Sequence, residues 1–249
     1  MSTNRFFVSR SDFAGDRVRL SREQAHQVRQ VLRLRPGDMI VVLDGQGMEY
    51  EVKLATVSHS EAVGQITSSR AAAGEPVVQL TLFQSLLVRE KFEWVLQKGA
   101  EVGVTEFVPI LTSRGIVRTR EIDEGKHDRW RRIVTEAAEQ SHRGRVPKID
   151  QVITFSDAVS QLTGFDHCLI AAPSQETKGL RDALLGVPGK DASIALMIGP
   201  EGGFTDEEVA MACEKGAVAV GLGPRILRTE TAAVVASALI LYELGEMRP

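Results

Sequence analysis

Cysteine, aromatic residues and long apolar runs are all scarce in this chain. Of its 249 residues, two are Cys and 5% are aromatic. Cys168 and Cys213 each lie within an apolar run, which is typical of buried thiols in a reducing compartment and excludes a disulfide framework. No apolar run reaches the ~18 residues that a membrane span needs, and the N-terminus lacks a secretory signal pattern. We therefore expect a cytoplasmic protein that does not enter a membrane.

Several ligand-binding motifs are also missing. The five His and two Cys show no metal-ligand spacing, so we expect no metal site. Neither glycine-rich phosphate-binding signature occurs, that is, G-x-x-x-x-G-K-[ST] or G-x-G-x-x-G after a strand. The G-x-S-x-G turn of serine hydrolases is absent too. These absences disfavour a nucleotide-dependent enzyme.

Net charge is small, since 30 Lys and Arg stand against 33 Asp and Glu. The charges are nevertheless unevenly distributed. Residues 1–35 contain eight Arg and three acids, and residues 113–148 contain ten basic and six acidic residues. Two basic segments on an acidic body favour a partner whose phosphates bind at defined places. The alternative is that these arginines form an ordinary solvated surface and bind no partner.

Residues 1–72 have the pattern of a small β-rich module. Short apolar segments separated by turns predict strands at 5–8, 39–43, 49–57 and 61–68. Ser21 with Gln24 at the third helical position is a capping box, which predicts that a helix begins there. Strands joined by short turns, with one basic helix, predict a small barrel. The buried face of the helix is predicted to be Ala25, Val28, Val31 and Leu32.

Beyond a linker expected at 70–76, strand and helix patterns alternate to the end of the chain. The helices are expected at 89–102, 127–142 and 229–244, and the strands at 77–82, 107–111, 168–172, 194–198 and 217–221. The last three strands are too apolar to be half-exposed, which predicts a parallel sheet covered on both faces. This order predicts an α/β domain over residues 77–249.

Two Gly- and Pro-rich segments each follow one of these buried strands. Ile198 precedes Gly-Pro-Glu-Gly-Gly-Phe-Thr, and Leu222 precedes Gly-Pro-Arg-Ile-Leu-Arg-Thr-Glu-Thr-Ala-Ala. A third strand runs into Pro173-Ser174. Ligands of open α/β sheets bind beyond the carboxyl ends of strands, and glycine lets the backbone approach them closely. We predict that the two segments build one pocket; the alternative is that they are plain structural turns.

Thr205 and Glu208 form a second capping box at the end of the first of these segments. The acids at 206–208 occupy the favourable field at the helix N-terminus. A phosphate is therefore not expected at this N-terminus. The pocket should instead bind a neutral or zwitterionic ligand through backbone groups.

With these features, the chain resembles the SPOUT methyltransferases. Within that group it is similar to enzymes that methylate N3 of a uridine in small-subunit (16S) ribosomal RNA. The similarity covers nearly the whole chain. It is carried by the segments 198–205 and 222–233, by 92–101 (Phe-Glu-Trp-Val-Leu-Gln-Lys-Gly-Ala-Glu), by Glu136-Ala-Ala-Glu-Gln-Ser141 with Arg143, by Arg5-Phe-Phe and by 31–38.

The resemblance implies a PUA-like RNA-binding barrel at 1–72 and a knotted α/β SPOUT domain at 77–249. It implies S-adenosyl-L-methionine as cofactor and a homodimer with the active site near the subunit interface. The partner is expected to be 16S rRNA or the assembled small ribosomal subunit. Leu222, Ile226 and Leu227 should flank the adenine. The cofactor-binding residues expected are Ala172, Ile198, Gly199, Pro200, Gly202, Gly203, Leu222, Gly223, Ile226, Leu227, Arg228, Thr231 and Ala232.

The implied reaction needs a cation and a base. Uridine N3 carries a proton at neutral pH, so that proton must leave and the resulting anion must be stabilised. We expect Arg228 to stabilise the anion and Glu230 or Glu201 to accept the proton. The alternative is that these charged residues only pair with one another, with Glu230 orienting Arg228.

The target base must be splayed out of the RNA to react, and phosphate contacts would supply salt-dependent affinity. A second hypothesis is a non-catalytic RNA-binding or ribosome-assembly protein with the same fold. Intact Gly202, Gly203, Gly223 and Thr231 argue against a decayed pocket. The RNA-contacting residues expected are Arg5, Arg29, Arg33, Arg35, Arg132, Gln140 and Arg143.

Overall fold

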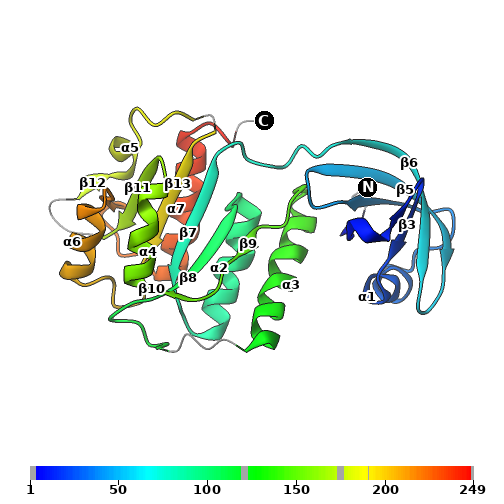
Figure 1. The fold of residues 1–249 in the computed structure, drawn as a ribbon, viewed down its shortest axis with the longest axis horizontal. Helices are drawn as coiled ribbons and strands as arrows, with labels where there is room; N and C mark the ends of the chain where they lie inside the picture. The colour runs from blue at the N-terminus through cyan, green and yellow to red at the C-terminus, as the bar shows by residue number, and fades with distance from the viewer. Residues whose placement is uncertain (1–3, 119–122, 173–176, 190, 248–249) are drawn as a thin grey trace. The chain divides into compact units, whose positions relative to one another are not determined.

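The computed structural model describes residues 4–118, 123–172, 177–189 and 191–247. The chain has an α/β fold that divides into two compact units (Figure 1). The first comprises residues 1–75 and 138–146, and the second comprises residues 76–137 and 147–249. Each unit carries one sheet.

The first unit is built on a six-stranded mixed sheet in the order β1-β4-β5-β6-β3-β2. Only β1 and β4 pair in parallel; the other neighbours are antiparallel. Alternate strand residues such as Ile40 and Val42 are fully buried against Val52 and Leu54, which gives the unit its own core. Its strands are β1 (Arg5–Phe7), β2 (Phe13–Ala14), β3 (Arg17–Leu20), β4 (Met39–Leu43), β5 (Met48–Val57) and β6 (Ala62–Ala71).

The helix predicted after Ser21 is present, and its capping box with Gln24 is confirmed. It begins as α1 (Arg22–His26) and continues as the π-helical turn η2 (Gln27–Val31), while η1 (Arg10–Asp12) is a short 3₁₀ turn. Val31 is 68% exposed, so its predicted place on the buried face is wrong. The Leu32 amide donates to the Gln27 carbonyl five residues back. This wider turn rotates the following side chains off the 3.6-residue period.

The linker expected at 70–76 begins later than predicted, because β6 extends to Ala71. Arg70 is a strand residue, and its guanidinium pairs with the Glu49 carboxylate of β5. Glu49 also pairs with Arg5 of β1. The two arginines therefore hold one buried carboxylate between three strands of the first unit.

The second unit contains an eight-stranded sheet, and the strands described in it all pair in parallel. The order is β10-β8-β7-β13-β11-β14-β12, with β9 paired to β8. The predicted parallel sheet is thus confirmed. Its strands are β7 (Gln79–Ser85), β8 (Glu106–Leu111), β9 (Lys148–Ile149), β10 (Ile153–Thr154), β11 (His167–Ala171), β12 (Lys178–Gly179), β13 (Ser193–Ile198) and β14 (Val218–Gly221).

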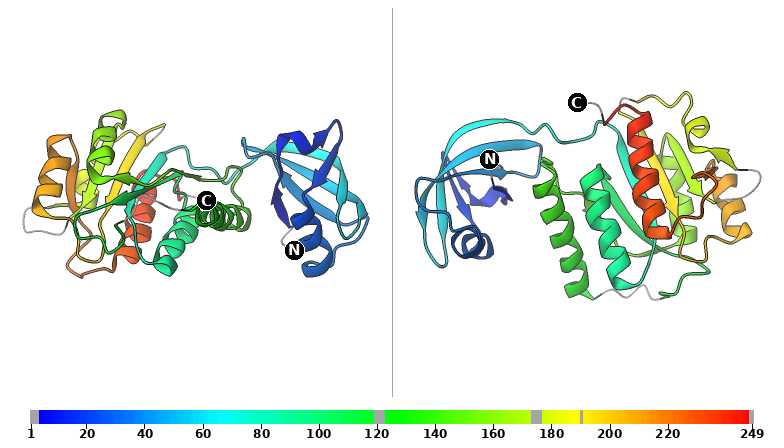
Figure 2. Two further views of the ribbon diagram at one scale, coloured as in Figure 1. Left: turned by 60° about the horizontal axis from the view of Figure 1, so that its bottom comes forward. Right: turned by 180° about the vertical axis from the view of Figure 1, so that it is seen from behind.

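Helices cover both faces of this sheet. Figure 2 shows α2 and α7 together on one face and α4 and α6 on the other. Gly99 lets α2 approach β8, since a Cβ there would lie 2.7 Å from a ring atom of Phe107. On the other face, Phe83 and Met197 of the strands pack with Phe155 and Phe204. The helices are α2 (Arg89–Val102), α3 (Glu124–Gln140), α4 (Phe155–Gln161), α5 (Leu180–Ala183), α6 (Asp206–Glu214) and α7 (Thr229–Glu243), with a 3₁₀ turn η3 (Leu162–Gly164).

Local sequence signals explain where several of these helices begin and end. α2 ends at Gly103, whose φ of 115° lies in the left-handed region that glycine adopts most readily. The capping box of Thr205 and Glu208 is confirmed at the start of α6. Cys168 is buried as predicted, but Cys213 is exposed, because it lies on the outer side of α6. Among the described residues, no helix is long and apolar enough to cross a membrane.

Candidate functional site

The two Gly- and Pro-rich segments lie at the same edge of the second unit's sheet. β13 and β14 both neighbour β11, and all three strands run in parallel. The loops that follow Ile198 of β13 and Gly221 of β14 therefore meet at the carboxyl ends of adjacent strands. Pro173 and Ser174, into which the third strand was predicted to run, lie outside the described residues.

The first loop depends on its glycines. Gly203 adopts φ +67° and closes a turn by donating from its amide to the Pro200 carbonyl at 2.9 Å. A Cβ at Gly199 would lie 3.1 Å from the Phe204 amide nitrogen. A larger residue at Gly199 would thus press on the loop backbone, whereas one at Gly203 would be strained by the positive φ alone.

A segment after β8 braces the same loop. Arg114 donates from Nη1 to the carbonyl oxygens of Gly202 and Phe204, each at 3.0 Å. The Ser113 amide donates to Oε1 of Glu208 at 2.8 Å, while Oε2 of Glu208 caps the Thr205 amide at 2.9 Å. Both oxygens of this buried carboxylate are therefore used, one in the helix cap and one in the contact with Ser113.

The second loop crosses the sheet edge to reach the start of α7. Gly223 adopts φ +94°. Thr229, the first residue of α7, donates from Oγ1 to the Gly199 carbonyl at 2.5 Å and accepts from Gln84 Nε2 at 3.3 Å. These buried hydrogen bonds tie the two loops to β7.

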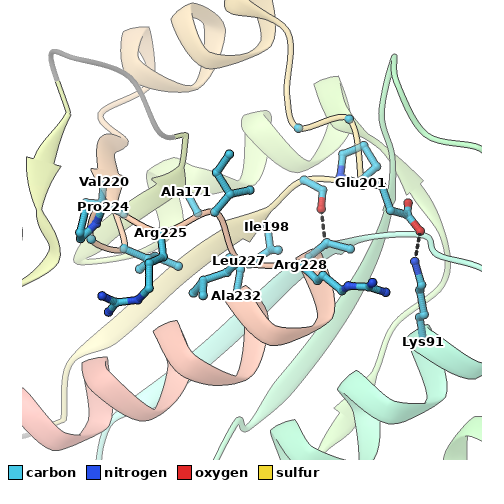
Figure 3. Close-up of a pocket in the computed structure, with 18 residues that line it drawn as sticks. Lys91, Ala171, Ile198, Glu201, Val220, Pro224, Arg225, Leu227, Arg228 and Ala232 are labelled. Carbon is cyan, nitrogen blue, oxygen red and sulfur yellow. Dashed lines mark hydrogen bonds and ion pairs between the residues drawn. The ribbon is translucent and has the colours of Figure 1, made fainter.

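A pocket of about 610 Å³ opens between the two loops (Figure 3). This volume is typical of a small-molecule site. Ala172 and Thr231, also predicted as cofactor residues, are not among its lining residues; Ala172 lines a neighbouring cavity of about 470 Å³. Predicted cofactor residues that do line the pocket are Ile198, Gly199, Pro200, Gly202, Gly203, Leu222, Gly223, Ile226, Leu227, Arg228 and Ala232. The other lining residues are Lys91, Ala171, Glu201, Val220, Pro224, Arg225 and Thr229.

Three of the four charged side chains that line this pocket lie at one end. Figure 3 shows Lys91, Glu201 and Arg228 there, while Val220 and Pro224 mark the other end. Lys91 donates from Nζ to Oε1 of Glu201 at 2.8 Å. This contact lowers the pKa of the Glu201 carboxyl and raises the pKa of the Lys91 ammonium. Both groups therefore stay charged over a wide pH range, and Glu201 is a weaker base than an unpaired glutamate.

Arg228 and Glu230 do not hold each other in place. Within the described part of the chain, the Arg228 guanidinium forms neither a hydrogen bond nor an ion pair. Glu230 follows in the first turn of α7, and its Oε2 is buried without a hydrogen-bond partner. Both groups contribute to the electrostatic field at Lys91. The pairing alternative for these two residues is thus not realised. Arg228 lines the pocket, whereas Glu230 is not among its lining residues.

The predicted RNA-contacting residues fall into two groups. The guanidinium of Arg143 is buried against Glu75, donating at 3.0 Å, and Arg5 is buried against Glu49. The expectation that Arg5 and Arg143 contact phosphates is therefore not supported, because each guanidinium already forms an ion pair with a carboxylate within the first unit. The exposed candidates are Arg29, Arg33, Arg35, Arg132 and Gln140.

Two residues of this site were not singled out from the sequence. Lys91 belongs to the first turn of α2, and Arg114 was only one member of a basic segment. The Lys91–Glu201 contact joins residues 110 apart in the chain, and the Arg114–Gly202 contact joins residues 88 apart. Neither contact has a local sequence signal.

Comparison with known proteins gives consistent matches. Residues 74–241 match the family model described as "RNA methyltransferase domain". The chain is 33% identical over 230 residues to ribosomal RNA small subunit methyltransferase E of Bacillus subtilis, covering 91% of this chain and 90% of that protein. It is 36% identical over 223 residues to the protein of that name from Synechocystis, covering 90% and 72%. The crystal structure of ribosomal RNA small subunit methyltransferase E from Neisseria gonorrhoeae, bound to S-adenosyl methionine, superposes with a TM-score of 0.86 at 32% identity, covering 97% and 98%.

Proposed function

Because the chain belongs to the ribosomal RNA small subunit methyltransferase E family, we propose that it transfers a methyl group from S-adenosyl-L-methionine to N3 of a uridine in 16S rRNA. The observation that carries this proposal is the pocket formed where the two glycine loops meet and are joined by Thr229 and Gly199. We propose that it acts in the cytoplasm, on 16S rRNA or the assembled small ribosomal subunit.

The residues of the pocket suit this cofactor. Apolar Leu222 and Leu227 line the pocket and can flank an adenine. Gly199, Gly202 and Gly203 line the pocket without side chains, so main-chain groups there can approach polar atoms of the cofactor. No phosphate is required, which agrees with the three acidic residues in the first turn of α6. When bound, the cofactor supplies a methyl group on a positively charged sulfur.

The connection between β14 and α7 supports the knot that the family resemblance implies. β14 lies beyond β11 as seen from β13, yet α7 begins with Thr229 bonded to Gly199 and Gln84. The segment 222–228 therefore crosses the carboxyl ends of β11 and β13. We propose a knotted SPOUT domain at 77–249, preceded by a PUA-like RNA-binding barrel at 1–72.

A homodimer is also part of the proposal. α7 is apolar along nearly its whole length, yet Leu239 is 42% and Tyr242 61% exposed. Large apolar side chains on an otherwise packed helix suit a contact with a second subunit. We also propose, from the family resemblance, that the active site lies near the subunit interface.

The charged end of the pocket suits the chemistry at N3. Arg228 has no competing carboxylate partner, so its guanidinium can stabilise the uracil anion. Glu230 acts electrostatically on Lys91 and keeps a buried carboxylate oxygen without a hydrogen-bond partner, and we propose that this carboxylate accepts the N3 proton. Glu201 is the less suitable base, because Lys91 already stabilises its charged form.

The proposal is tested by calorimetry with S-adenosylhomocysteine, followed by transfer of tritium-labelled methyl groups to unmodified small ribosomal subunits. Binding and formation of N3-methyluridine are expected. A folded dimer that does not bind S-adenosylhomocysteine would contradict the proposal. RNA binding without methyl transfer would instead favour a non-catalytic RNA-binding or ribosome-assembly protein. Mapping the methylated positions in rRNA from cells without the protein identifies the target nucleotide.

A further inference from the structure

The ammonium of Lys91 has a defined position at the charged end of the pocket. Lys91 is the third residue of α2, whereas its partner Glu201 belongs to the loop after β13. The Nζ–Oε1 distance is 2.8 Å, and the two side chains are 30% and 32% exposed. The ion pair therefore fixes the ammonium at the pocket wall while leaving part of it open to a ligand (Figure 3).

This ammonium has unused hydrogen-bonding capacity. A lysine ammonium carries three N–H donors and no acceptor. Within the part of the chain that the structure describes, Glu201 is the one hydrogen-bond acceptor of the Lys91 ammonium. Two donors remain, so Lys91 can bind a ligand oxygen without giving up the contact that positions it.

Lys91 and Arg228 together place two cations at this end of the pocket. Arg228 lies close enough to Lys91 to disfavour its protonation, and Glu201 offsets this by pairing with Lys91. In uracil, N3 lies between the carbonyl groups at C2 and C4, and loss of its proton spreads negative charge over N3 and both oxygens. Two cations can therefore stabilise this anion more than one cation does, with one at each carbonyl oxygen.

On the basis of the proposed N3-methylation, we propose that Lys91 contacts the substrate: its ammonium donates to a carbonyl oxygen of the target uracil and stabilises the N3 anion together with Arg228. Glu201 is then a positioning residue for Lys91. The N3–H bond breaks and its proton passes to the Glu230 carboxylate. The electron pair left on N3 forms the bond to the methyl group, whose former bonding pair stays on the cofactor's sulfur.

The test compares K91M, K91R and E201Q with the wild type and with a matched control, K98M. Lys98 lies on the same helix but pairs with Glu101 and does not line the pocket. Single-turnover methylation of unmodified small subunits is measured from neutral to alkaline pH, and S-adenosylhomocysteine binding is measured by calorimetry.

K91M is expected to methylate roughly 100-fold more slowly at neutral pH, the usual cost of removing one donor to a developing anion. Its pH–rate profile should shift to higher pH, because the N3 anion of the bound uracil is no longer stabilised by the Lys91 ammonium. K91R should retain most of the rate, and E201Q should show a smaller loss with a shift in the same direction. S-adenosylhomocysteine affinity should stay within about twofold throughout, and K98M should match the wild type.

Two results overturn the role of Lys91. One is a K91M enzyme with the full rate. The other is a K91M enzyme whose rate and cofactor affinity fall together without a shift in pH profile, as expected if the ion pair only braces the loop. The proposed function fails separately, if the wild-type protein itself forms no N3-methyluridine.

Discussion

Thr229 donates a hydrogen bond from Oγ1 to the carbonyl oxygen of Gly199 at 2.5 Å, across 30 positions of sequence. Thr229 is the first residue of α7, and Gly199 is the first residue after β13. The same hydroxyl accepts from Gln84 of β7. One buried side chain thus fixes the positions of three elements at the sheet edge where the pocket lies.

Replacing Thr229 with Val keeps the shape of the side chain but removes the hydroxyl. The Gly199 carbonyl then loses a buried partner, and Gln84 Nε2 keeps only the Ser85 carbonyl. We expect T229V to lose about 1–3 kcal/mol of unfolding free energy and to bind S-adenosylhomocysteine more weakly. Urea unfolding and calorimetry measure these effects. T229S keeps the hydroxyl and should resemble the wild type; equal losses in T229S and T229V would show that the hydroxyl is not the cause.

A glycine substitution can separate backbone strain from cofactor binding. Gly203 and Gly186 adopt φ +67° and +83°, and a Cβ at either position would meet no atom within 4 Å. Alanine at each site should therefore cost about 1–2 kcal/mol of stability through backbone strain alone. Gly203 lines the pocket and Gly186 does not. G203A should weaken S-adenosylhomocysteine binding while G186A leaves it unchanged, and similar affinities in the two variants would contradict the proposed recognition by the loop backbone.

Local signals in the sequence predict much of the fold. Each of the capping boxes that begin at Ser21 and Thr205 spans four residues and predicts the start of a helix. Both are present in the structure. The apolar run at 39–43 coincides with β4. The predicted buried face failed at Val31, because a π-helical turn changes the residue spacing without an evident change in composition. Helix caps and apolar strands, which depend on residues close in sequence, were therefore predictable. The local change in helical pitch was not.

Of the candidate site, the two glycine loops could be predicted from the sequence, but the side chains that reach them from other elements could not. The two glycine loops were recognisable because each follows a buried strand. Lys91 and Arg114 reach these loops only through the strand order of the sheet, which the sequence does not give. Charge counts likewise could not separate Arg29, which is exposed, from Arg143, which is buried against Glu75. Free and paired arginines have the same sequence signature.

The contact between α2 and α3 gives a prediction for acid stability. Arg129 donates to both carboxylate oxygens of Glu93, at 2.6 and 2.8 Å, and the Glu93 side chain is 12% exposed. Arg129 is the main reason that the pKa of this carboxyl lies below its usual 4.5. The stabilisation is therefore fully present above pH ~4.5 and is lost as the pH falls through the lower folded-state pKa.

E93Q should accordingly be less stable than the wild type by about 1–2 kcal/mol at neutral pH. The difference should shrink in acid, where the wild-type carboxyl also becomes neutral. Urea unfolding between pH 7 and pH 3 measures this, with E101Q as the control, because its ion pair with Lys98 is more exposed and should contribute little. A stability difference that does not change with pH would assign the effect to packing instead of charge.

Arg228 and Arg225 belong to the same loop and line opposite ends of the pocket (Figure 3). Arg228 lies near Lys91 and Glu201, and its side chain does not cap α7, so its removal should leave the helix start intact. We expect R228A to lower kcat about 100- to 1,000-fold, the range for lost electrostatic stabilisation of an anion. R225A should affect cofactor KM more than kcat, because it lies away from the charged end. Steady-state methylation of unmodified small subunits gives both constants. An R228A enzyme with full methylation and unchanged cofactor affinity would remove the assignment of this guanidinium to the reacting uracil.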